Sequence, residues 1–164
     1  MSKPKKEYRP NVGIMVVNRE GKVFVARRAD HRSKAWQMPQ GGIDKGENPL
    51  KAAFRELEEE TGIKTVRLIA ESKEWHAYDF PKGVTFTSEK KRSFKGQAQK
   101  WFLFMFDGDE KEIDLDQKHP EFDGWMWTDV EKVPDLIIEF KREVYEKVVS
   151  EFLSFVDAIR ASSD

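Results

Sequence analysis

Short apolar segments separated by turn residues are the first pattern along the chain. Val12–Val17 and Lys22–Ala26 are rich in branched side chains, and Asn18-Arg19-Glu20-Gly21 between them predicts a tight turn joining two strands. Trp101–Phe106 is apolar on both faces, which is typical of a central strand. Further strands are predicted at residues 35–38, 66–70 and 122–128.

In two segments the apolar residues have helical spacing instead of the alternation of a strand. Asn48-Pro49 is a good helix start and Thr61-Gly62 a good stop. Between them, one apolar stripe predicts the buried face: Leu50, Ala53, Phe54 and Leu57. A second, long amphipathic helix is predicted near the C-terminus, with a stripe that includes Val144, Val148, Phe152, Phe155 and Ile159. The sequence therefore predicts one α/β domain with a mixed sheet, spanning residues 1–164 with 1–7 as a flexible tail.

The first helix carries an unusual set of acidic residues away from its apolar stripe. Glu56, Glu59 and Glu60 fall within one arc of the helix, where like charges repel one another. A bound hard cation such as Mg²⁺ or Mn²⁺ would relieve that repulsion, since such ions prefer oxygen ligands and bind substrate phosphates. The alternative is a plain solvated acidic face.

Composition narrows the classes of function. The 164 residues include 29 basic and 30 acidic side chains, a net charge of −1, so bulk charge predicts no affinity for nucleic acid, DNA included, and any basic patch must be local. The absence of cysteine excludes disulfides, thiolate metal sites and cysteine nucleophiles. The basic start lacks the apolar core of a signal peptide, and no apolar run is long enough to span a bilayer. We therefore expect a cytoplasmic protein without membrane contact.

The segment from Gly41 to Ile63 resembles the Nudix box. Gly41, then Glu47, then Arg55-Glu56-Leu57, Glu59-Glu60 and Gly62-Ile63 agree with every specified position of that motif. The resemblance implies a hydrolase of nucleoside diphosphate derivatives with a Nudix α/β/α sandwich, a mixed central sheet, a Nudix loop and helix, and a long C-terminal helix. It also implies a divalent metal, Mg²⁺ first, with Mn²⁺ or Zn²⁺ as alternatives.

The resemblance also implies a role for each residue of the box. Glu56, Glu59 and Glu60 would be metal ligands, and Gly41 would offer its carbonyl. Glu56 would in addition orient or deprotonate the attacking water, with Glu60 as its catalytic partner. Three residues would have structural roles, holding the carboxylates and bracing the loop: Glu47, Arg55 and Gly62.

Runs outside the box are similar to the bacterial RNA pyrophosphohydrolases, also described as (di)nucleoside polyphosphate hydrolases. They are YRPNVG at 8–13, ARR at 26–28, WQMPQGGID at 36–44, QKWF at 99–102, PEFDGW at 120–125 and FKREVY at 140–145. By this resemblance Glu121 is a further metal ligand, although a turn residue before a strand is the alternative. Arg9 and Arg28 would contact phosphates, to which guanidinium is well suited, although solubility alone explains either.

The same resemblance places substrate-binding residues near the C-terminal helix. Lys141 and Phe140 would face the cleft, where the ring could stack on a base, and Tyr78 is a weaker candidate. Phe140 could equally be a core residue. Residues 88–100 are expected to form a basic loop, with Lys90, Lys91, Arg92, Lys95 and Lys100. That loop suits an RNA backbone, but a solvated surface is the alternative.

These observations favour a metal-dependent hydrolase that removes pyrophosphate from 5′-triphosphorylated RNA, leaves a 5′-monophosphate and so promotes RNA decay. The first alternative is an asymmetrical hydrolase of dinucleoside polyphosphates such as diadenosine tetraphosphate. A non-catalytic nucleotide-binding module of the same fold is a second alternative, but the complete set of box glutamates argues against it. No protein partner can be named from the sequence.

Overall fold

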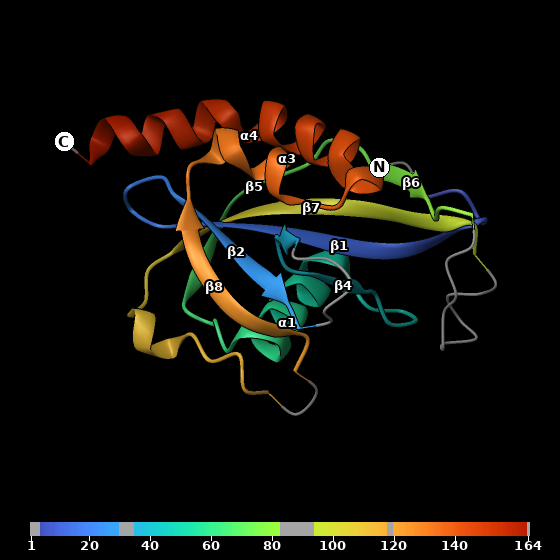
Figure 1. Cartoon of the computed structure of the whole chain (residues 1–164), viewed down its shortest axis with the longest axis horizontal. Helices are drawn as coiled ribbons and strands as arrows, with labels where there is room; N and C mark the ends of the chain where they lie inside the picture. The colour runs from blue at the N-terminus through green and yellow to red at the C-terminus, as the bar shows by residue number, and fades with distance from the viewer. Residues whose placement is uncertain (1–3, 30–34, 83–93, 118–119, 164) are drawn as a thin grey trace.

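A mixed sheet of eight strands organises the computed structural model, which describes residues 4–29, 35–82, 94–117 and 120–163 (Figure 1). The strands are β1 (Tyr8–Val17), β2 (Val23–Arg28), β3 (Trp36–Gln37), β4 (Gln40–Gly42), β5 (Val66–Glu71), β6 (His76–Asp79), β7 (Gly96–Phe106) and β8 (Phe122–Thr128). The helices are α1 (Pro49–Thr61), α3 (Val133–Leu136) and α4 (Arg142–Ser162), with single 3₁₀ turns η1 (Glu110–Glu112), η2 (Val130–Lys132) and η3 (Glu139–Lys141).

Strand β7 is the centre of the sheet, as its apolar sequence predicts. It runs parallel to β1 on one side and antiparallel to β5 and β6 on the other, and all eleven of its residues are buried. The hairpin of β1 and β2 is confirmed, with Val17 opposite Val23. Beyond that pair, β2 turns away and pairs with β8 and β3.

Alternation along β1 and β7 gives the sheet two apolar faces, because successive side chains point to opposite sides. Val12, Ile14 and Phe102 pack on the face that α1 covers, whereas Met15 and Leu103 pack on the face that α4 covers. Figure 1 shows α4 along one side of the sheet and α1 on the other. The predicted Nudix α/β/α sandwich with a long C-terminal helix is confirmed.

The ends of α1 follow the predicted capping residues. The Asn48 side chain accepts a hydrogen bond from Leu50 N at 2.8 Å, and Pro49 opens the first turn, where no N–H partner is needed. Gly62 ends the helix in the left-handed conformation, with φ +77°, and its N–H donates to Glu58 O at 2.9 Å. Local sequence alone therefore fixes where the carboxylate-bearing helix begins and ends.

We expect the change Gly62→Ala to destabilise the fold by about 2–3 kcal/mol, because a left-handed backbone and a crowded site coincide there. A Cβ at Gly62 would lie 2.8 Å from the carbonyl oxygen of Glu112. Gly46 is a matched control, with the same φ of +77° and nothing within 4 Å of its added Cβ. Urea unfolding of Gly46→Ala should show a loss of only about 1 kcal/mol; equal losses in the two variants would contradict the crowding.

Two residues of the predicted apolar stripes are less buried than expected. Phe54 of α1 stays 37% exposed, although its ring lies 4.8 Å from that of Phe104. Phe155 of α4 is 42% exposed, beside a groove at the sheet edge. Helical spacing alone could not show this, because it gives the direction of a side chain and not how far the sheet extends beneath it.

The predicted basic loop at 88–100 was wrong at its C-terminal end. Gly96–Lys100 belong to β7, and Lys100 is only 2% exposed because its stem packs along the sheet. Lys95 is exposed and lies over the Tyr8 ring at 5.2 Å. Lys90, Lys91 and Arg92 lie outside the described residues. Tyr78 belongs to the short strand β6, which pairs with β7, and is 7% exposed.

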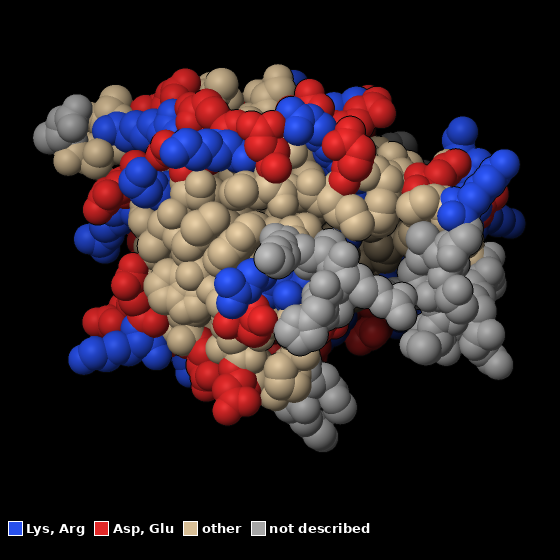
Figure 2. All heavy atoms as spheres, in the orientation of Figure 1, with Lys and Arg blue, Asp and Glu red and all other residues tan. Residues whose placement is uncertain are grey.

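The surface matches the near-zero net charge. Figure 2 shows basic and acidic side chains interspersed along α4. The surface directly below α4 in this view has few charged side chains. On that face, the described residues form no continuous basic surface. None of the described helices is long and apolar enough to cross a membrane.

Candidate functional site

Glu56 and Glu60 of α1 lie near Glu121, at the place where β2 ends and β8 begins. Strand β8 begins one residue after Glu121, and Arg28 of β2 pairs with Phe122 across a register shift. The Ala29 N–H donates to Glu121 O at 2.9 Å, which fixes the backbone of this corner. Glu121 thereby comes close enough to Glu56 and Glu60 to raise the pKa of both.

Glu60 lies at the most enclosed point of the site. Burial is the main reason that its pKa is raised well above the usual range, and Glu121 and Glu56 add repulsion. The backbone N–H of Gln40 and the charge of Arg28 act in the opposite direction. One of its oxygens, Oε2, is buried with no hydrogen-bond partner within the described structure. An ionised carboxylate in this position needs a cation to compensate its burial.

Glu56 lies directly against the glycine-rich segment. A Cβ at Gly41 would lie 2.0 Å from the carboxyl carbon of Glu56, so only glycine permits this approach. Burial raises the pKa of Glu56, while the Arg55 guanidinium lowers it and Glu59 and Glu121 raise it further. Gly41 is part of strand β4, not of a loop as expected, and Val12 of β1 lies opposite it.

Arg55 connects the loop to the carboxylates. Its guanidinium donates to both oxygens of Glu47, each at 2.8 Å, and to the carbonyl of Gly42 at 2.9 Å. It also donates to Glu56 at 2.9 Å and to Glu59 at 3.2 Å. The hydrogen bonds from Arg55 lower the pKa of Glu47 to about 2. Glu59, whose side chain is 58% exposed, lies at the outer rim of the cluster.

The donor set fits a hard divalent cation. All the candidate groups are oxygens, from the glutamate carboxylates and the Gly41 carbonyl, and the Glu60 Oε2 without a hydrogen-bond partner needs a positive charge. In the described part of the chain no three Asp, Glu or His side chains already converge on a single metal position. Mutual repulsion and the contacts of Arg55 with Glu56 and Glu59 account for that separation.

We expect metal binding to release protons, because a ligand must be deprotonated to bind. The raised pKa values of Glu60 and Glu56 leave a fraction of each protonated as the pH falls towards the acid range. The affinity for Mg²⁺ should therefore fall as pH is lowered. Calorimetric titration in buffers of different ionisation enthalpy measures the protons released, and buffer-independent heats throughout that range would contradict the prediction.

Two arginines predicted to bind phosphate lie on the α4 side of this cluster. Arg9 lies over Gly42, and a Cβ added to Gly42 would lie 2.3 Å from a terminal nitrogen of the Arg9 guanidinium. The same guanidinium donates a hydrogen bond to the Gln97 side-chain oxygen at 3.2 Å. Arg28 lies 3.4 Å from the Gln37 side-chain oxygen and lowers the pKa of Glu60 electrostatically. Both guanidinium groups lower the pKa of Tyr78, although burial dominates and raises it to about 12. The structure therefore brings both arginines near the side chain of Tyr78.

The three predicted base-binding residues form one group at the start of α4. The rings of Tyr78 and Phe140 lie 5.7 Å apart, and the Lys141 Nζ lies 5.6 Å from the centre of the Tyr78 ring. Lys141 is only 7% exposed and ends the turn η3, just before α4. Phe140 is half-buried and packs against the core, as one of the two alternatives for it expected, and part of its ring stays exposed. Tyr78 is too buried to be an open stacking platform.

Sequence reasoning missed a network of side-chain amides beneath the cleft. Gln97 accepts from Asn11 at 3.0 Å, while Gln99 donates to Asn11 and to Gln40, each at 2.9 Å. Gln97 also donates to the hydroxyl of Tyr78. The signal was present: Gln97 and Gln99 alternate with apolar residues before Trp101, as in a strand with one polar face. Assigning these residues to a loop concealed it.

Comparison with known proteins shows which family the chain resembles. Residues 7–148 match the family model of the NUDIX domain. The chain is 51% identical over 156 residues to the RNA pyrophosphohydrolase of Agrobacterium fabrum, covering 88% of this chain and 91% of that protein. It is also 51% identical over 148 residues to the RNA pyrophosphohydrolase of Rhodospirillum rubrum, covering 90% and 88%.

Solved structures share the fold at much lower identity. The dihydroneopterin triphosphate pyrophosphohydrolase of E. coli superposes with a TM-score of 0.65 at 18% identity, covering 88% of this chain and 98% of that one. A binary complex of the Ap4A hydrolase of C. elegans gives a TM-score of 0.64 at 19% identity, covering 89% and 98%. At such identities the likeness establishes the architecture alone.

Proposed function

The chain belongs to the NUDIX domain family, and from this premise we propose that it removes pyrophosphate from the 5′-triphosphate end of RNA to leave a 5′-monophosphate, which promotes RNA decay. The observation that carries the proposal is identity of about half of all residues, along almost the whole chain, to curated RNA pyrophosphohydrolases. The retained carboxylate cluster supports an active enzyme and argues against a non-catalytic binding module. We place its action in the cytoplasm, where new transcripts carry triphosphate ends.

The carboxylate cluster is proposed to perform the hydrolysis. Glu56, Glu59, Glu60 and Glu121, with the carbonyl of Gly41, would hold divalent cations, Mg²⁺ in the first place and Mn²⁺ or Zn²⁺ as alternatives. A bound cation of this kind neutralises phosphate charge and makes a coordinated water more acidic. Glu56 would accept the proton of the attacking water, and its raised pKa suits a general base. Burial of Glu60 keeps bulk water from that side of the site.

The cleft on the α4 side is proposed to hold the substrate. Arg9 and Arg28 present planar donors that suit two oxygens of a phosphate chain. Lys141 adds a positive charge beside the rings of Tyr78 and Phe140, and the exposed part of Phe140 would stack on a base of the RNA. The hydrogen bond from Arg9 to Gln97 holds that guanidinium over Gly42 in readiness for phosphate.

A second candidate substrate is a dinucleoside polyphosphate such as diadenosine tetraphosphate, cleaved asymmetrically. The observation that favours it is the run WQMPQGGID at 36–44, which resembles proteins also described as (di)nucleoside polyphosphate hydrolases. The same carboxylates and arginines would act on either phosphate chain. The two substrates differ in the length of the phosphate chain and in what is attached to its ends.

A competition assay distinguishes the two substrates. Short 5′-triphosphate RNA and diadenosine tetraphosphate are mixed at equal concentrations with limiting Mg²⁺, and the ratio of their kcat/KM values is measured from product formation. We expect the RNA to be converted preferentially. Processing of the dinucleotide with no conversion of the RNA would contradict the proposed function and leave the second candidate in place.

A further inference from the structure

A groove separate from the proposed active site lies between the sheet edge and α4. It has a volume of about 580 Å³ and is lined by Ala70, Glu71, Lys73, Glu74, His76, Glu151, Phe152, Ser154 and Phe155. None of these residues belongs to the carboxylate cluster or the substrate cleft. Volumes of this size are typical of small-molecule sites. We propose that this groove binds a linear aliphatic polyamine, and this claim does not depend on the proposed RNA substrate.

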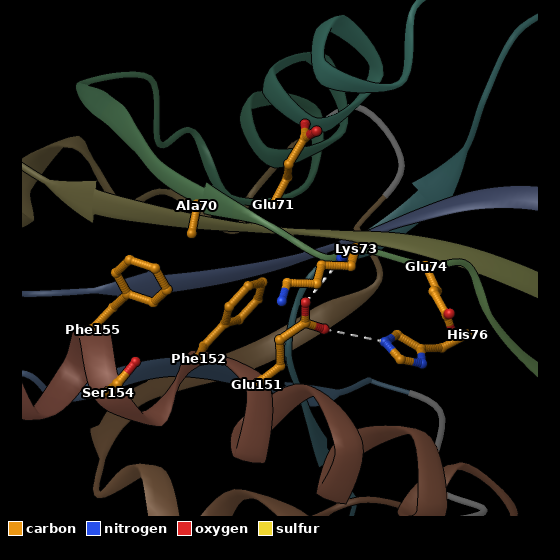
Figure 3. Close-up of a pocket in the computed structure, with 9 residues that line it drawn as sticks. All are labelled: Ala70, Glu71, Lys73, Glu74, His76, Glu151, Phe152, Ser154 and Phe155. Carbon is orange, nitrogen blue, oxygen red and sulfur yellow. Dashed lines mark hydrogen bonds and ion pairs between the residues drawn. The ribbon is translucent and has the colours of Figure 1, made fainter. Parts of the chain in front are cut away.

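The apolar part of the groove suits an aliphatic chain. Phe152 and Phe155 project from α4 toward Ala70 of β5, as Figure 3 shows. Phe152 is 1% exposed and forms the floor, whereas Phe155 leaves 42% of its surface open. Aromatic faces attract cations as well as methylene groups, so the two rings suit both parts of a polyamine.

The polar end of the groove contains acceptors without enough donors. Glu151 accepts a hydrogen bond from the Lys73 backbone N–H at 2.9 Å through Oε2. Its other oxygen, Oε1, lies 3.5 Å from the Nε2 of His76, a contact that is an ion pair only when His76 is protonated (dashed line in Figure 3). That nitrogen is buried and has no hydrogen-bond partner within the described structure. A primary ammonium donates three hydrogen bonds, so one such group could reach both Glu151 and the Nε2 of His76.

The charges of the lining favour a cation. Among the described residues that line the groove, Glu71, Glu74 and Glu151 carry negative charge and Lys73 is the one lysine. Glu71 turns its carboxylate away from α4, so Glu74 and Glu151 are the carboxylates nearest His76 (Figure 3). A chain with several ammonium groups would meet carboxylates at one end and aromatic rings at the other.

The test is calorimetric titration of the whole protein with spermidine and with cadaverine, in excess Mg²⁺ so that the catalytic carboxylates are occupied. We expect saturable one-site binding with a Kd below about 1 mM. Pentylamine and 1-pentanol, titrated in the same way, share one aliphatic stem and differ in the charged amine. We expect 1-pentanol to bind at least about 10-fold more weakly than pentylamine. The change Glu151→Gln should weaken spermidine binding about 10-fold, and Phe155→Ala should weaken it several-fold.

Glu143→Gln is the matched control, since it removes one negative charge from α4 outside the groove, where Glu143 pairs with Lys147 at 3.4 Å. We expect the affinity of this variant to stay within about 2-fold of the original, because exposed charges are screened. Thermal unfolding of each variant checks that the fold is retained. Absence of saturable polyamine binding, or equal weakening by Glu143→Gln and Glu151→Gln, would overturn the proposal. Binding of Nα-acetyl-lysine amide without binding of polyamines would also overturn it, because the groove would then be a contact for a protein chain.

Discussion

Substituting Glu60 by glutamine is expected to lower kcat at least about 1,000-fold, which corresponds to about 4 kcal/mol of lost transition-state stabilisation. The amide keeps the shape of the side chain but removes the charge that a divalent cation needs. Glu60 is partly buried, and its Oε2 has no hydrogen-bond partner among the described residues, so this oxygen is available to a cation. Steady-state hydrolysis of 5′-triphosphate RNA in Mg²⁺ measures the effect.

The same substitution should stabilise the metal-free protein. The folded-state pKa of Glu60 is raised above its unfolded value, so ionisation of Glu60 opposes folding above that unfolded value. Glutamine removes this cost, and the Tm without metal should therefore rise while the further increase caused by Mg²⁺ disappears. The control is Glu58→Gln, an exposed position of the same helix, which should change kcat less than about 2-fold. Full activity of Glu60→Gln would contradict the proposed mechanism.

Replacing Arg55 by alanine is expected to lower the free energy of unfolding by about 2–3 kcal/mol and kcat/KM by about 10- to 100-fold. The guanidinium holds Glu47, the Gly42 carbonyl and Glu56 together, so its removal leaves partly buried acceptors without donors. The ion pair of Arg55 with Glu47 stabilises the folded state fully at pH values above about 4.5, the pKa of a glutamate in the unfolded chain. This contribution is lost as the pH falls toward about 2, the pKa of Glu47 in the folded state.

The pH dependence separates this contribution from a general loss of packing. The stability difference between the original protein and Arg55→Ala should narrow as pH falls from about 4.5 to about 2. Urea unfolding at a series of pH values measures it. Arg67→Ala is the control, because Arg67 is 65% exposed and its single pair with Asp107 should contribute less than about 1 kcal/mol. A pH-independent difference for Arg55→Ala would show that the Glu47 pair is not its cause.

Local patterns predicted much of the fold because they act over a few residues. Asn48 and Gly62 set the ends of α1 through their own backbone and side-chain preferences, and the apolar sequence of 101–106 indicated the central strand. The spacing of Glu56, Glu59 and Glu60 likewise indicated the carboxylate cluster. These features needed no information about the rest of the molecule.

Features that depend on distant contacts were less predictable. Lys100 is charged and follows a basic segment, yet it is buried because β7 extends to Gly96 beside β1. Phe155 has the spacing of a core residue, yet no strand covers it fully. The partners of Gln97 lie at Arg9, Asn11 and Tyr78, and only the pairing of β1, β6 and β7 brings them together.

Hydrolysis of 5′-triphosphate RNA in ¹⁸O-labelled water with Mg²⁺ is the most direct test of the central claim. The account predicts RNA with a 5′-monophosphate and a released pyrophosphate, with one ¹⁸O from water incorporated at the phosphorus attacked. Omitting the divalent cation or introducing Glu60→Gln should prevent formation of the labelled products. If the triphosphate end remains intact with Mg²⁺ present while the protein is folded, the proposed function is wrong.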